Sequence, residues 1–206
     1  MRVFKIPVGP FEMNSYILAP DSESAALLID PGDEPERILQ VLKEETLTPA
    51  KIVCTHAHID HIRYLSSIKE VLKVPLYLHE DDLPLLEGMK DQALIFGLDS
   101  APVPEVDGFL NDEDVFTIGN LQVKVLHTPG HSPGSLCFYA DGHLFAGDVL
   151  FKESIGRTDL YGGNFEQLIH SIRQKLFTLP ETTVVHPGHG EDTTIAHEKT
   201  KNPFLR

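Results

Sequence analysis

Residues 51–61 read KIVCTHAHIDH, an apolar run followed by three histidines and an aspartate within six positions. In an extended segment, side chains two positions apart project to the same side, so His56 and His58 are expected to face one way. Asp60 and His61 begin a helical pattern and are expected to point elsewhere. This short stretch therefore predicts two groups of metal ligands at the end of a strand, each able to serve one ion.

The ligand types in this stretch indicate what kind of site it forms. Imidazole and carboxylate suit borderline divalent ions. The cluster contains no cysteine, which closed structural zinc sites commonly use. Histidines hydrogen-bonded in a surface turn would account for one or two of these side chains, but not for all four. An open, catalytic metal site is the better interpretation.

Three further candidate ligands occur downstream. His131 lies in a turn rich in proline and glycine, Asp148 ends an apolar run, and His189 follows another. Each stands just beyond a predicted strand, which is where open α/β sheets gather their ligand groups. Together with the first cluster they supply five histidines and two aspartates, enough for two metals with open coordination positions.

The seven candidates match, one for one, the ligand pattern of a known family, the metallo-β-lactamase superfamily: His56, His58, Asp60, His61, His131, Asp148 and His189. Within it the chain resembles the short, single-domain glyoxalase II (hydroxyacylglutathione hydrolase) proteins of bacteria. That closer resemblance rests on residues 7–10 (PVGP), 154–159 (SIGRTD) and 202–205 (NPFL). It covers nearly the whole chain and implies a four-layer αββα sandwich of the α/β (α+β) class.

The resemblance also implies how the ligands are divided between two divalent ions, with zinc favoured and iron or manganese as alternatives: His56, His58 and His131 for the first, Asp60, His61 and His189 for the second, and Asp148 bridging both. Asp60 and Asp148 are the predicted catalytic carboxylates. The ion pair would acidify a bridging water toward a pKa of about 7 and so supply hydroxide. The resemblance implies thioester hydrolysis, with S-D-lactoylglutathione as the substrate. Because a thiolate leaves readily, this reaction does not require a strong general acid.

Other polar residues are candidates for supporting roles. Asp30 ends a strand and either orients a ligand histidine or forms a turn. Arg63 either holds a substrate carboxylate or is a solvated surface residue. Tyr161 is a candidate substrate contact, and Arg157 and Asp159 are expected to pair with each other or brace the metal loop.

Two other reactions remain open at this stage. Persulfide dioxygenases share the block at residues 156–159, and by that resemblance His56, His131 and Asp148 would form a mononuclear iron site with two histidines and one carboxylate. The sequence PGHG at residues 187–190 fits the hydrolases better. A broader thioesterase or lactonase is also possible, because function is determined by the site and not by the fold.

Length and charge restrict the partners. The chain has 206 residues, enough for one domain over 1–206, and only residues 190–206 follow His189, so the helical C-terminal region that binds glutathione in two-domain glyoxalase II enzymes is not expected. A net charge of -14 and the lack of a Lys/Arg run disfavour nucleic acid and leave a small-molecule thioester as the expected partner. Nothing in the sequence specifies an oligomeric state.

The cysteines and the hydropathy pattern indicate in which cellular compartment the protein is expected. The two cysteines, Cys54 and Cys137, lie in apolar runs and are predicted to be buried thiols in a reducing environment. No basic segment followed by an apolar stretch begins the chain, and no apolar run reaches the length of a membrane span. A cytoplasmic protein without a membrane partner is expected.

The remaining pattern predicts the layers. Strand-like runs fall at residues 3–8, 15–19, 25–30, 51–54, 75–79, 115–118, 121–126, 135–139, 143–146 and 183–186. Helical periodicity covers residues 35–44, 60–72, 165–176 and a shorter stretch at 80–87. Runs of strands separated by helices predict two packed sheets with helices outside. Residues 88–108 show no clear periodicity and are predicted to form a long loop, which either contacts substrate or buries Phe96 and Phe109 in the core.

Overall fold

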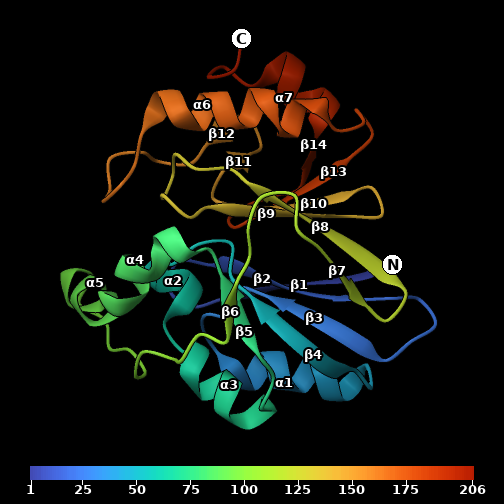
Figure 1. Cartoon of the computed structure of the whole chain (residues 1–206), viewed down its shortest axis with the longest axis vertical. Helices are drawn as coiled ribbons and strands as arrows, with labels where there is room; N and C mark the ends of the chain where they lie inside the picture. The colour runs from blue at the N-terminus through green and yellow to red at the C-terminus, as the bar shows by residue number, and fades with distance from the viewer.

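The computed structural model of residues 1–206 contains two six-stranded sheets packed face to face (Figure 1). The first sheet has, in order across it, β1 (Arg2–Val8), β2 (Met13–Ala19), β3 (Ala25–Ile29), β4 (Thr48–Val53), β5 (Leu76–Leu78) and β6 (Gly108–Phe109). The second has β14 (Thr193–Thr194), β13 (Val184–Pro187), β10 (His143–Gly147), β9 (Leu136–Ala140), β8 (Leu121–His127) and β7 (Val115–Ile118). A separate hairpin joins β11 (Leu150–Phe151) and β12 (Ser154–Ile155).

Helices cover both outer faces of the sandwich (Figure 1). The first sheet is covered by α1 (Pro35–Glu44) and α3 (Leu65–Leu72), and the second by α6 (Phe165–Gln174) and α7 (Ile195–Lys201). The short elements are α2 (Ile59–Ile62), η1 (Glu80–Asp82), α4 (Leu83–Glu87), α5 (Met89–Ile95) and η2 (Leu176–Thr178). None of the helices combines the length and apolar character that a membrane span requires.

Strand β2 shows why the layers stack in this way. All of its residues are buried, and successive side chains point to opposite faces. Ile17 and Ala19 pack into the apolar core under α1 and α3, whereas Tyr16 and Leu18 pack into the core between the two sheets. A third apolar core lies between the second sheet and its helices. Three cores separate four layers, so the predicted αββα sandwich is confirmed.

The predicted helix at residues 60–72 is interrupted. It consists of α2 and α3, with Arg63 and Tyr64 between them. The Tyr64 amide donates to the carbonyl of Gly32 (2.7 Å), and a Cβ on Gly32 would lie 2.3 Å from the carbonyl carbon of His61. The turn after β3 therefore packs directly on the ligand segment, which a single straight helix would not allow.

The prediction of an irregular loop over residues 88–108 is wrong in its first part, where α5 forms. Its apolar residues do not share one face: Met89 and Ala93 are buried, but Leu94 and Ile95 are each 77% exposed. Phe96 and Phe109, which one interpretation placed in the core, are exposed as well. The two-residue strands and α7 were also not predicted, because segments of that length and polarity show no periodicity.

The two sheets meet at one edge of the molecule, where the ligand segments lie. The parallel strands β3 and β4 end there in the first sheet, as do the parallel strands β10 and β13 in the second. A backbone bridge pairs Met13 with His189, and the Asn14 amide donates to the carbonyl of Gly188 (2.7 Å). Segments far apart in the sequence are thereby fixed side by side.

Candidate metal centre

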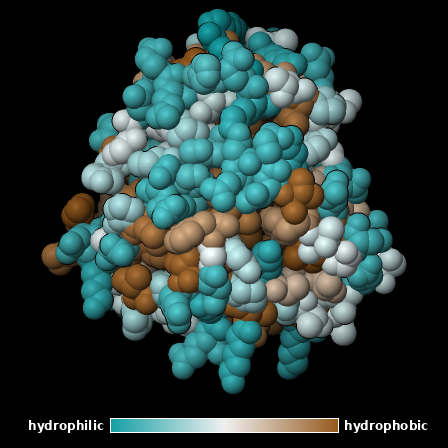
Figure 2. All heavy atoms as spheres, viewed as in Figure 1, coloured by the Kyte–Doolittle hydropathy of each residue, from teal (hydrophilic) through white to brown (hydrophobic).

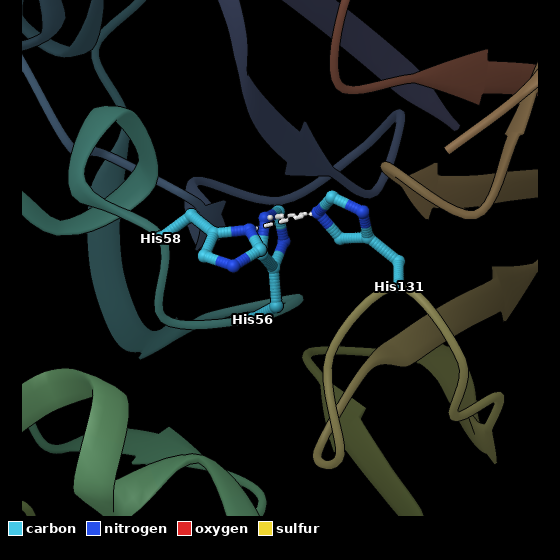
Figure 3. Close-up of side chains that lie close together, drawn as sticks. All are labelled: His56, His58 and His131. Atoms are coloured by element: carbon cyan, nitrogen blue, oxygen red, sulfur yellow. Dashed lines mark hydrogen bonds between the residues drawn. The ribbon is translucent and has the colours of Figure 1, made fainter. Parts of the chain in front are cut away.

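The first ligand set consists of three buried histidines. His56 and His58 lie in the loop after β4, and His131 lies in the facing turn between β8 and β9. Figure 3 shows the three imidazoles pointing toward one another. The His58 Nδ1 atom lies 2.8 Å from the His131 Nε2 atom, which lies 3.2 Å from the His56 Nε2 atom. These atoms are close enough together to bind one ion.

The second ligand set combines one carboxylate with two histidines. The Asp60 Oδ2 atom lies 3.0 Å from the His189 Nε2 atom and 3.7 Å from the His61 Nε2 atom. Asp60 and His61 belong to α2, whereas His189 follows β13 in the opposite sheet. The seam between the two sheets therefore passes through this set.

Asp148 lies between the two sets. Its Oδ1 atom is 3.4 Å from the His61 Nε2 atom. Its Oδ2 atom is 3.6 Å from the Nε2 atom of His189 and 3.8 Å from that of His131. One carboxylate thus reaches members of both sets, and all seven predicted ligands come together at one place.

Buried polar atoms without partners test whether the residues fit a pair of metal ions. The His61 Nε2 and Asp148 Oδ1 atoms face each other, and neither has a hydrogen-bond partner, although both are buried. Leaving such an atom unsatisfied costs about 1–3 kcal/mol. A cation between these atoms would satisfy both of them. The donor set of imidazoles and carboxylates suits zinc, iron or manganese.

Two histidines of the first set, His56 and His58, are uncharged. Burial, and after it the neighbouring His131, lowers the pKa of His58 to about 3. Burial and the surrounding imidazoles hold the pKa of His56 well below its ordinary value. Both rings are therefore unprotonated at neutral pH, which is the form that binds metal.

The second set holds protons. Burial alone would lower the pKa of His61, but the carboxylates of Asp60, Asp30 and Asp148 raise it well above its ordinary value. The pKa of His189 is also raised, because its hydrogen bond to Asp60 outweighs the effect of burial. Burial would raise the pKa of Asp148, but the charge of His61 lowers it. A metal entering this set must displace protons.

Several ligand rings are oriented through their second nitrogen. The His61 Nδ1 atom donates to the Asp30 Oδ2 atom (2.9 Å), and Asp30 also accepts from the amide and hydroxyl of Thr55. The His131 Nδ1 atom donates to the carbonyl of Arg157 (2.8 Å), and the His189 Nδ1 atom donates to that of Phe11 (3.1 Å). These contacts leave the Nε2 atoms directed at the centre.

A cavity of about 250 Å³ opens beside both ligand sets. Besides ligands, its walls contain Phe11, Ile59, Gln92, Phe96, Arg157 and Leu160. A larger cavity, of about 640 Å³, lies beside Met1 and Tyr139 and touches none of the ligands. Substrate chemistry therefore belongs to the smaller cavity.

Comparison with known proteins agrees with this geometry. The profile of the Metallo-beta-lactamase superfamily matches residues 8–189, which include all seven ligands. The chain belongs to the metallo-beta-lactamase superfamily. A probable metallo-hydrolase, YqgX of Bacillus subtilis, is 42% identical over 100% of this chain and 98% of its own length. The hydroxyacylglutathione hydrolase GloC of Haemophilus influenzae is 38% identical over 100% of this chain and 98% of its own length.

Two solved structures are similar over nearly the whole chain. The B3 metallo-beta-lactamase BLEG-1 has a TM-score of 0.92 and 41% identity, covering 99% of each chain. TTHA1623, solved in a di-iron-bound form, has a TM-score of 0.89 and 41% identity, covering 98% of this chain and 100% of its own.

Asp82 is a residue of this metallo-beta-lactamase fold that sequence reasoning missed. Its side chain is fully buried at the end of η1. The Oδ2 atom accepts from the Ala57 amide (2.9 Å) and the Ser132 hydroxyl (2.8 Å), and the Oδ1 atom accepts from the Gly134 amide (2.6 Å). Asp82 thus joins the loop of His56 and His58 to the turn of His131. In the sequence it is one of three adjacent acidic residues, and nothing distinguishes the buried one.

Two predicted substrate contacts lie away from the cavity. The Arg63 guanidinium pairs with Asp33 (3.0 Å) and with Asp99, and Arg63 does not line the cavity. Tyr161 is 67% exposed and is not part of the lining either.

The predicted pair of Arg157 and Asp159 is confirmed by two hydrogen bonds, of 2.7 and 2.8 Å. The hydrogen bond from the Arg157 guanidinium lowers the pKa of Asp159 to about 2. The carbonyl of Arg157 meanwhile orients His131, so this loop does brace the metal centre.

Proposed function

We propose that the protein is a metal-dependent thioester hydrolase, and specifically a hydroxyacylglutathione hydrolase that cleaves S-D-lactoylglutathione. The observation that carries the proposal is the pair of ligand sets joined by Asp148 beside an open cavity. The 38% identity to a hydroxyacylglutathione hydrolase supports the choice of substrate.

The side chains around the cavity leave water as the nucleophile. Cys54 and Cys137 are fully buried, and burial raises the pKa of the Cys137 thiol to about 12. The Ser132 hydroxyl is buried and donates to Asp82. Two divalent ions, zinc by preference and iron or manganese as alternatives, would supply Lewis acidity and lower the pKa of water to about 7. A thiolate leaving group needs no strong acid, and no free acidic side chain other than the ligands lines the cavity.

The proposal is tested by loading the purified protein with zinc, iron or manganese and measuring metal content together with thiol release from S-D-lactoylglutathione. We expect about two equivalents of metal and turnover that disappears when a chelator removes them. A protein that carries two metals and cleaves no thioester would contradict the proposal.

Two alternatives are distinguished in the same experiment. The 41% identity to a B3 metallo-beta-lactamase supports hydrolysis of a β-lactam, in which water would attack an amide carbonyl. A mononuclear iron site made of His56, His131 and Asp148 would support persulfide oxidation instead, with one equivalent of iron and uptake of oxygen from a solution of glutathione persulfide. Turnover of a β-lactam or of the persulfide in preference to the thioester would select that alternative.

A further inference from the structure

Two exposed aromatic rings stand at the mouth of the cavity. We propose that Phe11 and Phe96 form a subsite that binds an uncharged, apolar substituent of the substrate beside the scissile bond. This inference rests on the proposed hydrolysis of thioesters. It extends the substrates from S-D-lactoylglutathione, which has no apolar substituent, to thioesters that carry one.

The two rings are packed against each other but are not buried. Their centroids lie 5.5 Å apart with the planes at 80°, an edge-to-face contact. Phe11 remains 40% exposed and Phe96 45% exposed, and both line the cavity together with Asp60 and His189 of the second set. The surface they leave open to solvent adjoins the reacting centre. An apolar group bound there would remove that surface from water, which is favourable.

Both rings are held in place by the ligand segments. The carbonyl of Phe11 accepts the hydrogen bond from His189. Phe96 caps the C-terminus of α5. One turn earlier, the Gln92 side chain accepts from the Ile59 amide (3.0 Å) and donates to the carbonyl of Ala57 (3.0 Å). The position of each ring relative to the metal ligands is therefore fixed by hydrogen bonds, as a binding subsite requires.

No cationic side chain around the subsite is free to bind an anionic substituent. Apart from the ligands, Arg157 is the only charged residue lining the cavity, and its guanidinium is occupied by Asp159. Lys5, which shares an adjoining groove with Phe11, pairs with Asp192 (3.0 Å). The Gln92 amide is also fully used, because it donates to the carbonyls of Ala57 and Leu85. The subsite thus offers apolar surface without a free cationic side chain.

The hydrophobic character of this region extends along α5. Leu94 and Ile95 are each 77% exposed beside Phe96. In Figure 2 hydrophobic side chains interrupt the hydrophilic surface at the left of the view, where Figure 1 places α5. These two residues do not line the cavity, so they serve as matched controls on the same helix.

The test uses two series of thioesters, because the apolar group could belong to either side of the scissile bond. One series keeps N-acetylcysteamine as the thiol and varies the acyl group from acetyl to hexanoyl and phenylacetyl. The other keeps the lactoyl group and varies the thiol from glutathione to N-acetylcysteamine and benzyl mercaptan. In one of the two series we expect kcat/KM to rise about 10-fold or more with the apolar substituent. The series that shows this rise identifies whether the bound group belongs to the acyl or the thiol side of the scissile bond.

The variants Phe11→Ala and Phe96→Ala should reduce that preference to within about 3-fold, with unchanged metal content. Phe109→Ala, a phenylalanine of similar exposure (41%) outside the cavity, and Leu94→Ala should retain it. Turnover without a preference, or a preference that both ring variants retain, would overturn the subsite and leave the proposed function standing. Failure to cleave any thioester of either series, with two metals bound, would overturn both.

Discussion

The two ligand sets share Asp148 but differ in charge and in support. The first set is built from imidazoles, and burial keeps His56 and His58 neutral. The second set contains Asp60, and its carboxylate surroundings keep His61 protonated. Proximity alone therefore does not make two sites equivalent. The first set can accept an ion without releasing protons from His56 or His58, whereas the second must exchange protons for its ion.

The residues that hold the two ligand sets in place, Asp82 and Asp30, also differ. Asp82 holds the first set through the backbone, because it accepts from amides on two separate loops. Asp30 holds the second set through a ligand itself, because it accepts from the His61 ring. It also reaches the first set indirectly, because it accepts from the Thr55 hydroxyl, which lies 3.0 Å from the His56 Nδ1 atom. The first arrangement fixes the distance between loops, and the second fixes the orientation and charge of one imidazole.

The largest expected effect comes from removing the carboxylate that both sets share. Asp148→Asn keeps the shape of the side chain but loses its charge, so turnover of the thioester should fall at least about 100-fold, with loss of bound metal. Thiol release and elemental analysis measure the two effects. Glu113→Gln, which removes an exposed carboxylate paired with Lys124 away from the ligands, is the control. If Asp148→Asn keeps its rate and its two metals, Asp148 is not the shared ligand.

The next effect separates the two supports. Asp82→Asn should weaken binding at the first set by about 10- to 100-fold, because loss of an orienting contact typically costs that much affinity. Asp30→Asn should weaken binding by a similar factor at the second set and less at the first, which it reaches only through Thr55. Competition with a chromophoric chelator measures the affinity for the first and for the second equivalent of metal separately. Each variant acts as the control for the other. Equal weakening of both equivalents by either variant would show that the sets are not supported independently.

A smaller effect distinguishes the sets by pH. In the metal-free protein the raised pKa values of His61 and His189 keep protons on the second set near neutral pH. Each proton that metal displaces makes the affinity fall about tenfold per unit of decreasing pH. The lowered pKa values of His56 and His58 add no such dependence between pH 6 and 8.

We therefore expect the second equivalent to bind more weakly as the pH falls from 8 to 6, with a steeper dependence than the first. Metal titrations at several pH values, with proton release followed in weak buffer, measure both slopes. Parallel slopes for the two equivalents would contradict the difference in charge.

The clustering of the seven candidate ligands was predictable because metal chemistry restricts residue type and spacing. His56, His58, Asp60 and His61 are close in sequence, and His131, Asp148 and His189 each follow an apolar run. Apolar runs also made the longer strands of both sheets predictable. Asp82 and Phe96 were not predictable in this way, because their roles depend on contacts with Gly134 and Phe11, respectively, residues far away in the chain. Such pairings are set by how the two sheets pack, which a local pattern does not contain.

The smallest effect concerns Arg63, which the sequence suggested as a contact for a substrate carboxylate. Its guanidinium is already used by Asp33 and Asp99, and its carbonyl accepts from the Ala101 amide (3.0 Å), so it ties the segment after α5 to the end of α2. Arg63→Ala should therefore change the KM for S-D-lactoylglutathione by less than about 3-fold and lower the melting temperature by about a few degrees.

Arg63→Lys is the matched variant, because it keeps the charge but cannot make the same forked contacts. A contact with a substrate carboxylate, in contrast, would be a charge-assisted hydrogen bond of about 1.5 to 3 kcal/mol, and its loss would raise KM about 10- to 150-fold. Such a rise for the glutathione thioester, without one for an uncharged N-acetylcysteamine thioester, would return Arg63 to the substrate site. It would also show that the ion pairs of Arg63 with Asp33 and Asp99 break when substrate binds. The segment after α5 would then move relative to the second ligand set.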